Sequence, residues 1–271
     1  MSQERDYVLG THDDELSRLG LQHAVWRPHC TAAWRRAGFT AGHTLLDVGC
    51  GPGWASFDLA QIARERGKVV AVDRSRRFLD ALEDGARARG LANIEAHERD
   101  LDSQGLPDVA ADGAWARWVF AFVQQPQQLL RRVVDRLKPG GTLVIHEYVD
   151  YRTWRLSPRS AAFEEFVTEV MASWRATGGE PDIALDLARW LPGMDCTLVE
   201  TNVITEVARP GDWWWEWPRA FVAIGLQRLV DLGRVSESRA AEMRAAFAEA
   251  ERTDGAFLLT PAVLEIVARK K

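Results

Sequence analysis

Residues 45–53, LLDVGCGPG, constrain the fold more than any other part of this 271-residue chain. The apolar run at 44–48 stops at three glycines, Gly49, Gly51 and Gly53, and an amphipathic segment follows at 55–66. This order is typical of a buried strand, a tight turn and a helix. Because glycine has no Cβ, a ligand can approach such a turn closely and meet the free N–H groups of the following helix. The segment therefore predicts a nucleotide-type pocket.

The spacing of the glycines separates this loop from two common nucleotide-binding loops. The pattern is G-x-G-x-G with Asp47 in front of it, whereas dinucleotide-binding folds use G-x-G-x-x-G. The lysine of the phosphate-binding loop is also missing from the pattern. A second strand, predicted at 68–72, ends in Asp73, one helix and one strand after the glycine loop. A carboxylate at such a strand end can accept hydrogen bonds from both hydroxyl groups of a ribose.

Four stretches, in order, resemble the motifs of the class I S-adenosylmethionine-dependent methyltransferases. LLDVGCGPG is similar to the first motif of that family, and VVAVD at 69–73 to the second. Asp100 and Leu101 follow a short strand predicted at 94–97, where the family usually places an acidic residue against adenine. LKPGG at 137–141 precedes the run TLVIHEYV, as in the turn before the fifth strand of the family. The resemblance covers residues 40–150 well and the rest of the chain loosely.

The resemblance implies that the cofactor is S-adenosylmethionine and indicates which residues bind it. Backbone groups from Gly49 to Gly51 would face its methionine end, Asp73 its ribose, and Asp100 with Leu101 its adenine. Arg117, at the end of the fourth strand, would lie near the amino group of the cofactor or make a salt bridge at the pocket edge. The candidate cofactor-binding residues are Asp47, Gly49, Cys50, Gly51, Gly53, Asp73, Arg74, Asp100, Leu101 and Arg117.

Strands and helices alternate through the first half of the chain, which predicts an α/β fold with a mostly parallel sheet. The resemblance implies a Rossmann-like, doubly wound sheet of seven strands whose last strand is antiparallel. The predicted strands are 44–48, 68–72, 94–97, 114–120, 142–149, 196–207 and 262–268. The predicted helices between them are 55–66, one from Ser75 to Gly90, one from Pro126, 159–177 and 182–191.

Two other regions are predicted to form a helical lid over the carboxyl ends of the strands, where open α/β sheets bind ligands. One consists of a helix from Thr11 to Arg27 and a second helix at 29–37, separated by Pro28. The other has two helices, one carrying Trp214 and one starting near Ser236. The expected divisions are N-terminal lid helices (1–38), the cofactor-binding core (39–150), the rest of the core (151–210), a helical cap (211–256) and the last core strand (257–271).

The acceptor end of the reaction is poorly marked in the sequence. In-line displacement from a sulfonium mainly requires alignment in a dry pocket, and a general base only where the acceptor must lose a proton. The candidate catalytic residues are Glu147, Tyr148 and His29, and further candidates are Asp150, Tyr151 and His12. Strand alternation places His146 and Glu147 on opposite faces of the sheet. Many family members carry a histidine after the fourth strand, where this chain has Phe122.

Tryptophan is abundant, with twelve residues, four of them in the predicted cap at Trp213, Trp214, Trp215 and Trp217. They could form a wall for an aromatic or cationic acceptor. Alternatively, they could bury apolar surface within a small cap, and we favour this second interpretation. A helix cannot turn three consecutive side chains to one face, and an exposed aromatic patch could also be a homodimer surface.

Composition and charge argue against several other classes of protein. The net charge of −5 and pI near 5.8 give no basic surface for nucleic acid. No apolar stretch approaches the roughly 20 residues that span a bilayer, and the N-terminal segment lacks the apolar core of a signal peptide, so we expect a cytoplasmic protein without a membrane partner. Cys30, Cys50 and Cys196 have no metal-ligand spacing, so no metal is expected.

The sequence therefore predicts an enzyme that transfers a methyl group from S-adenosylmethionine to oxygen, nitrogen or carbon of a small molecule. One alternative is a protein of the same fold that binds S-adenosylmethionine without methylating, as a catalyst of rearrangement or as a scaffold. A more distant alternative is an NAD-dependent oxidoreductase, which the spacing of the glycines disfavours.

Overall fold

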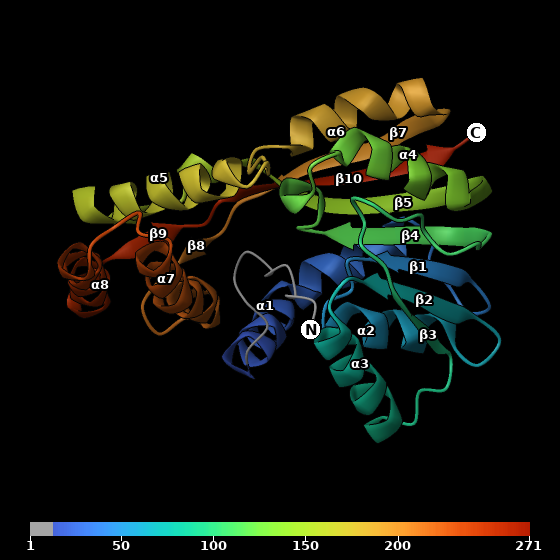
Figure 1. The fold of residues 1–271 in the computed structure, drawn as a ribbon, viewed down its shortest axis with the longest axis horizontal. Coiled ribbons are helices and arrows are strands. Elements are labelled where there is room, and N and C mark those ends of the chain that lie inside the picture. The colour runs from blue at the N-terminus through green and yellow to red at the C-terminus, as the bar shows by residue number, and fades with distance from the viewer. Residues whose placement is uncertain (1–12) are drawn as a thin grey trace.

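A computed structural model describes residues 13–271, apart from the side chains of residues 13 and 14. At its centre lies a seven-stranded sheet with the order β3-β2-β1-β4-β5-β10-β7 (Figure 1). The strands are β1 (Thr44–Val48), β2 (Lys68–Asp73), β3 (Ile94–Glu98), β4 (Ala111–Arg117), β5 (Leu137–Asp150), β7 (Cys196–Ile204) and β10 (Ala262–Lys270). The first five strands are parallel, and β10 is antiparallel to both β5 and β7. The predicted Rossmann-like sheet with an antiparallel last strand is confirmed.

Helices cover both faces of this sheet, which explains why its central strands are apolar on both sides. One face carries α1 (Asp13–Arg36), α2 (Trp54–Ala63) and α3 (Arg76–Ala88), and the other α4 (Pro126–Arg136) and α6 (Ala184–Trp190) (Figure 1). Alternate residues of β2 show the division: Val69 and Ala71 belong to one apolar core, and Val70 and Val72 to the other.

The helix α1 runs without a break past Pro28, so the prediction of two helices separated by this proline is wrong. Proline inside a helix removes one backbone hydrogen bond and costs about 3 kcal/mol. Trp26, Cys30 and Trp34 of α1 are completely buried against the core. Each large apolar side chain buried in this way contributes about 1.5–3 kcal/mol, which outweighs the cost of the proline. The predicted helix start at Thr11 lies outside the described residues.

The fourth strand ends at Arg117 rather than at residue 120, which corrects the sequence-based boundary. Trp118 has a φ of 51°, a left-handed conformation that is rare for a bulky residue and turns the chain out of the sheet. The short 3₁₀ helix η1 (Phe120–Phe122) follows. The backbone N–H groups of Val119 and Phe120 donate to the side chain of Glu147 instead of to a neighbouring strand. A tertiary contact therefore overrides the strand pattern at this point.

The cap contains α5 (Ala161–Ala176), α7 (Trp213–Asp231) and α8 (Glu237–Arg252), and a second sheet with the order β6-β9-β8 (Figure 1). The two helices predicted for the cap are present as α7 and α8. The helix α5 packs against both, so it lies with the cap although the sequence analysis grouped it with the core. The second sheet is formed by β6 (Arg155–Ser157), β8 (Val207–Ala208) and β9 (Phe257–Leu259). Strands of two or three residues are too short to show a period of two, and the sequence did not reveal them.

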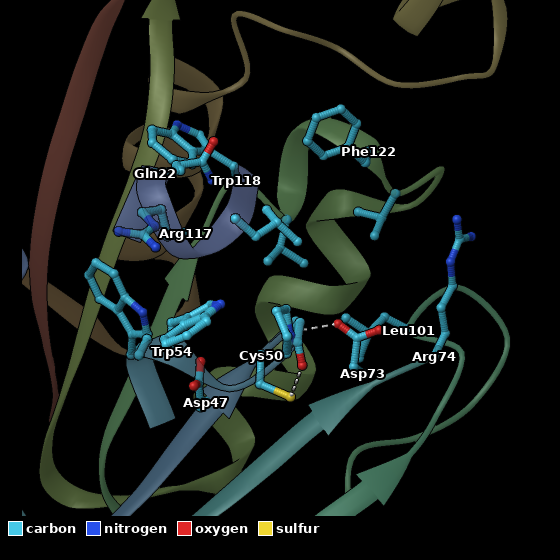
Figure 2. Close-up of a pocket in the computed structure, with 18 of the residues that line it drawn as sticks. Gln22, Asp47, Cys50, Trp54, Asp73, Arg74, Leu101, Arg117, Trp118 and Phe122 are labelled. Carbon is cyan, nitrogen blue, oxygen red and sulfur yellow. Dashed lines mark hydrogen bonds between the residues drawn. The ribbon is translucent and has the colours of Figure 1, made fainter. Parts of the chain in front are cut away.

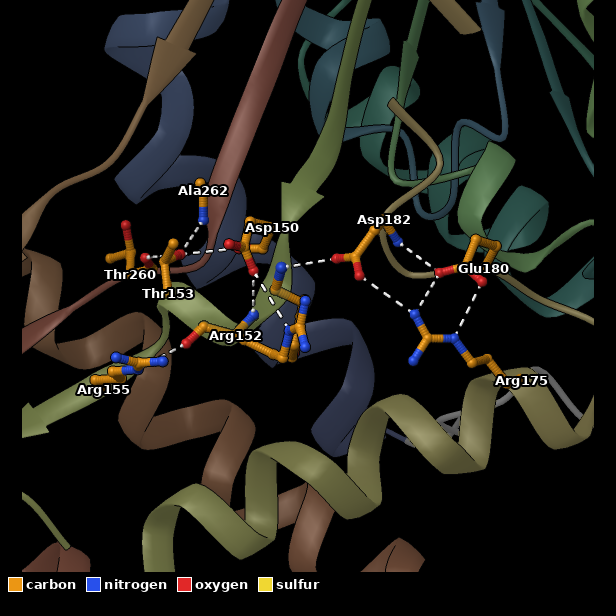
Figure 3. A network of polar contacts seen from close by, with 10 residues as sticks. Asp150, Arg152, Thr153, Arg155, Arg175, Glu180, Asp182, Thr260 and Ala262 are labelled. Atoms are coloured by element: carbon orange, nitrogen blue, oxygen red, sulfur yellow. Dashed lines mark hydrogen bonds and ion pairs between the residues drawn. The ribbon is translucent and has the colours of Figure 1, made fainter. Parts of the chain in front are cut away.

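A polar network fixes the junction between core and cap, where the chain leaves β5 (Figure 3). Asp182 accepts hydrogen bonds from the backbone N–H of Tyr151 at 2.8 Å and from Arg175 of α5 at 3.2 Å. Thr153 Oγ1 accepts from the backbone N–H of Ala262, the first residue of β10, at 2.7 Å. The end of β5 is thereby tied to the last turn of α5 and to the start of β10, which holds the cap against the core.

The proline within α1 gives a prediction about stability. We expect Pro28→Ala to raise the free energy of unfolding by about 1–2 kcal/mol, because alanine restores the missing helix hydrogen bond while making the unfolded chain more flexible. Pro28 is exposed, so no packing is lost. Urea denaturation followed by circular dichroism measures the change, and an unchanged or lower stability would show that the proline is not strained in this helix.

Candidate functional site

A pocket lies where β1, β2 and β4 end at the same level of the sheet (Figure 2). In the strand register Val48 is paired with Val72 and with Ala116, so the residues that follow these three meet at one edge. All the predicted cofactor-binding residues except Gly53 line this pocket: Asp47, Gly49, Cys50, Gly51, Asp73, Arg74, Asp100, Leu101 and Arg117. The structure therefore brings together residues from four separate segments of the sequence.

The three glycines of the loop have different surroundings, although all have positive φ. A Cβ on Gly49 would lie 2.4 Å from Val119 Cγ2, and one on Gly53 2.6 Å from Leu82 Cγ. These two glycines are required for packing around the loop. A Cβ on Gly51 would meet no atom within 4 Å, so this part of the backbone faces open space in the pocket.

Asp73 holds the glycine loop in place from the end of β2. Its carboxylate accepts hydrogen bonds from the backbone N–H groups of Gly51 at 2.8 Å and of Ser75 at 2.9 Å. Burial raises the pKa of Asp73, while these two donors and the backbone N–H of Arg74 act in the opposite direction. A carboxylate has about four lone-pair sites, so about one remains for a group in the pocket.

Two other side chains of the loop region are buried and favour their neutral forms. Asp47 accepts a hydrogen bond from Ser56 Oγ at 2.6 Å, and burial raises its pKa to about 7. Burial also raises the pKa of the Cys50 thiol well above its usual value. A protonated thiol is a poor nucleophile. We therefore interpret Cys50 as a small side chain that fits the turn, and not as a nucleophile.

Asp100 shapes the loop that follows β3. Its carboxylate accepts from the backbone N–H of Asp102 at 3.0 Å and from Ser103 Oγ at 2.9 Å. Asp102 also lines the pocket, which the sequence analysis missed, and accepts from the backbone N–H of Gln124 at 2.7 Å. The loops after β3 and β4 are thereby tied together beside the pocket.

Arg117 places a positive charge at the pocket. Its guanidinium donates to Cys30 Sγ at 3.1 Å and lies 3.2 Å from His23 Nδ1. Burial lowers the pKa of His23, so its ring is neutral and Nδ1 accepts from Arg117 while Nε2 donates to Asp58. Within residues 15–271 no carboxylate forms a salt bridge with Arg117. A cation with two neutral partners is suited to bind an anionic group of a ligand.

Comparison with known proteins agrees with this geometry. Residues 46–145 match a protein family described as "Methyltransferase domain". The core of this chain is thus similar to a methyltransferase domain over residues 46–145. A curated relative, the cypemycin N-terminal methyltransferase of a Streptomyces species, is 40% identical over 103 residues, which are 37% of this chain and 40% of that protein. The chain thus matches less than half the length of this relative.

Solved structures share the fold of this chain. Coclaurine N-methyltransferase bound to N-methylheliamine and S-adenosylhomocysteine has a TM-score of 0.59 at 16% identity, over 90% of this chain and 72% of that one. The [4+2]-cyclase SpnF has a TM-score of 0.57 at 19% identity, over 90% of this chain and 80% of that one. At these identities the likeness concerns the fold alone.

The pocket fits S-adenosylmethionine, the cofactor that the resemblance implies. The open backbone at Gly51 gives room for close approach, and Asp73 has a lone-pair site left for a ribose. Arg117 offers a cation that forms no salt bridge with a carboxylate in residues 15–271, at the end of the site where the resemblance places the methionine part. Among the described residues, no three histidine, cysteine or acidic side chains gather closely enough to hold a metal ion.

Of the three candidate catalytic residues, Tyr148 lines the pocket and the other two do not. Glu147 points to the opposite face, where Oε1 accepts from the backbone N–H groups of Val119 at 2.6 Å and Phe120 at 2.7 Å. Burial raises the pKa of Glu147 to about 8. Its surroundings suit a residue that positions the loop after β4, and its catalytic role stays an untested prediction.

The histidine candidates lie outside the pocket lining. His29 Nε2 lies 3.1 Å from Glu206 Oε1, and its ring contacts Trp26 and Trp214. His146, on the face opposite to Glu147, forms a buried pair with Glu265 at 2.9 Å. His12 lies outside the described residues. A catalytic role for His29 is likewise untested.

The four cap tryptophans are absent from the described lining of the pocket. Trp213 is 56% exposed, whereas Trp215 is fully buried against Phe247 and donates to Glu251 at 2.8 Å. Trp217 stacks on Trp118 with ring centroids 5.6 Å apart. Trp118 itself lines the pocket, so Trp217 supports this part of the lining from behind.

In the described part of the chain, no helix is both long enough and apolar enough to span a bilayer.

The surroundings of Glu147 predict a dependence of stability on pH. The pKa of Glu147 is near 4.5 in the unfolded chain and about 8 in the folded one. Its neutral form is the one that fits, so its contribution to stability is complete below about pH 4.5 and is lost as the pH rises to about 8. Glutamine cannot titrate. The stability of Glu147→Gln relative to wild type should therefore rise by a few kcal/mol between about pH 5 and pH 8.5.

Urea denaturation at several pH values measures this difference, and the titration of Asp47 cancels because both proteins contain it. A difference that stays constant with pH would contradict the raised pKa of Glu147.

Proposed function

We propose that this chain is a methyltransferase that transfers the methyl group of S-adenosylmethionine to a small molecule. One observation carries the proposal: a single pocket at the carboxyl edge of the sheet joins a polar half to an apolar half. Asp47, Asp73 and Asp100 belong to the polar half, and Trp118 and Tyr148 to the apolar half. A reaction between a nucleoside cofactor and a second molecule requires adjoining sites of this kind.

In the proposed reaction the protein mainly binds and aligns. When bound, S-adenosylmethionine supplies a methyl group activated by a sulfonium. Asp73 would hold the ribose, Asp100 and Leu101 would contact the adenine, and Arg117 would bind the carboxylate of the methionine part. Alignment of the acceptor in a pocket closed by α1 and the cap would account for most of the rate.

The chemical class of the acceptor, its reacting atom and the base that takes its proton also belong to this proposal. The aromatic side chains of the pocket support an aromatic acceptor, and the Tyr148 hydroxyl is the candidate base at the pocket. The name of the cypemycin relative states methylation of an N-terminus, which supports nitrogen as one possible acceptor atom. A homodimer and a cytoplasmic location are predictions from the sequence.

The ribose contact gives the first binding prediction. We expect Asp73→Ala to lower the affinity for S-adenosylhomocysteine by about 100-fold, since the ligand loses charge-assisted hydrogen bonds and the glycine loop loses its anchor. Isothermal titration calorimetry measures the affinity. Asp84→Ala is the matched control, because Asp84 is exposed on α3 and pairs only with Arg87 among the described residues. Folded wild-type protein that does not bind S-adenosylhomocysteine would refute the proposed function.

The role of Arg117 is tested by a ligand that lacks the amino-acid part. We expect Arg117→Met to weaken S-adenosylhomocysteine by about 10–100-fold, because one charged hydrogen-bonding group contributes about 1.5–3 kcal/mol. Binding of 5′-methylthioadenosine, which has no carboxylate, should change less than twofold. Asp73→Ala should weaken both ligands. Equal losses for both ligands in Arg117→Met would show that Arg117 acts on the fold of the pocket and not on the carboxylate.

A non-methylating role is the second candidate, because the SpnF cyclase has the same fold. Incubation with methyl-labelled S-adenosylmethionine and a panel of small acceptors separates the two candidates. Label in a new product supports methyl transfer. Binding of the cofactor with no label transferred to any compound, including extracts that contain the native acceptor, favours the second candidate. Displacement of the cofactor by NAD would instead support an oxidoreductase.

A further inference from the structure

The apolar half of the pocket is a wall of aromatic rings. Its lining comes from the turn after β4, η1, β5, α5 and α7, which contribute Trp118, Phe122, Tyr148, Trp174 and Phe221. Tyr148 stacks on Trp118 with ring centroids 5.3 Å apart, and Phe122 meets Trp174 at 4.7 Å. Tyr148 also lies 6.0 Å from Trp174, so these four rings form a continuous surface that favours contact with another flat ring.

Gln22 of α1 is the polar side chain beside this wall. Figure 2 shows Gln22 next to Trp118, on the side of the pocket away from Asp47 and Asp73. Gln22 Oε1 accepts hydrogen bonds from Arg18 Nη1 at 2.9 Å and from Trp217 Nε1 at 3.2 Å. Guanidinium and indole groups can only donate, so both must face the oxygen of the amide. The orientation of the amide is therefore fixed by chemistry.

The fixed orientation leaves the amide nitrogen of Gln22 as an available donor. No described residue accepts from Nε2, and the side chain is nine-tenths buried at the pocket. The nitrogen keeps exposed surface, unlike the indole nitrogens of Trp26 and Trp118, which are enclosed without a partner. A buried donor directed at a pocket favours a ligand with an acceptor atom.

The charge beside Gln22 is balanced within the protein. Arg18 donates to both carboxylate oxygens of Glu15, at 2.7 Å and 2.6 Å, and both side chains are buried. This pair and Trp217 hold Gln22 in place. A protonated amine could not accept a hydrogen bond from Gln22 Nε2 and would face the guanidinium of Arg18. The apolar half therefore suits an uncharged molecule.

We propose, on the basis of the proposed function, that the acceptor is a flat aromatic molecule with a neutral oxygen atom to which Gln22 Nε2 donates a hydrogen bond. The oxygen belongs to a carbonyl, hydroxyl or ether group. The aromatic wall binds the ring, and Gln22 selects the oxygen and so fixes which edge of the ring faces the methyl group. Gln22 is thus a specificity-determining residue.

Three naphthalenes of similar shape test this selection: 2-acetylnaphthalene with a carbonyl, 2-ethylnaphthalene without oxygen, and 1-(2-naphthyl)ethylamine with a cation. Their affinities are measured by calorimetry in the presence of S-adenosylhomocysteine. For the wild type we expect the ketone to bind about fivefold more tightly than the hydrocarbon, the effect of one neutral hydrogen bond, and the amine to bind most weakly.

Gln22→Glu is the decisive variant, because its carboxylate still accepts from Arg18 and Trp217 but has no N–H group. We expect the ratio between ketone and hydrocarbon to fall to about one and the amine to gain affinity. Gln127→Glu, an exposed change of the same kind at the start of α4, should keep the wild-type ratio. Unchanged affinity for S-adenosylhomocysteine in Gln22→Glu shows that the pocket is intact.

The inference is overturned if the ratio persists in Gln22→Glu, if the amine binds wild type best, or if no naphthalene binds to wild type that binds S-adenosylhomocysteine. The wild-type comparison decides the question even if Gln22→Glu does not fold. Failure of wild type to bind S-adenosylhomocysteine is a different result, since it refutes the proposed function itself.

Discussion

Acidic side chains that accept hydrogen bonds from backbone N–H groups hold the pocket together. Loops at the carboxyl edge of a parallel sheet leave donors without partners, and an unsatisfied buried donor costs about 1–3 kcal/mol. Asp73 accepts a hydrogen bond from the backbone N–H of Gly51 in the glycine loop, and Glu147 accepts one from the backbone N–H of Val119 in the loop after β4. Asp102 accepts one from the backbone N–H of Gln124. Each of these acids accepts from at least one donor on a different segment of the chain, so the loops are positioned relative to one another before any ligand binds.

The helix α1 connects the two halves of the pocket. Gln22 lies beside the aromatic wall, whereas His23 and Cys30 of the same helix contact Arg117 on the cofactor side. Trp217 of α7 donates to Gln22, so the cap reaches the same helix. Because α1 is continuous past Pro28, a single helix supplies contacts to both halves of the pocket.

The sequence predicted those parts of the fold that depend on local signals. The glycine loop and strand β1 follow from residues 44–53 alone, and Asp73 from a strand end. The predictions failed or were silent where distant contacts decide. Trp118 leaves the strand because Glu147 takes the N–H groups that follow it. Pro28 stays in a helix because Trp26, Cys30 and Trp34 of the same helix are buried. No sequence motif marks Gln22 as a site residue, because its environment is created by Arg18 and Trp217 together.

The same contrast explains why the methyl donor is easier to infer than the acceptor. The cofactor half is built from short local motifs within residues 45–117, and the match to methyltransferase domains covers 46–145. The acceptor half takes its side chains from α1, α5 and α7 as well as from the core. Substitutions in those helices alter the acceptor site without disturbing the glycine loop. A likeness confined to the core therefore identifies the cofactor, and the acceptor has to be inferred from individual contacts such as the fixed amide of Gln22.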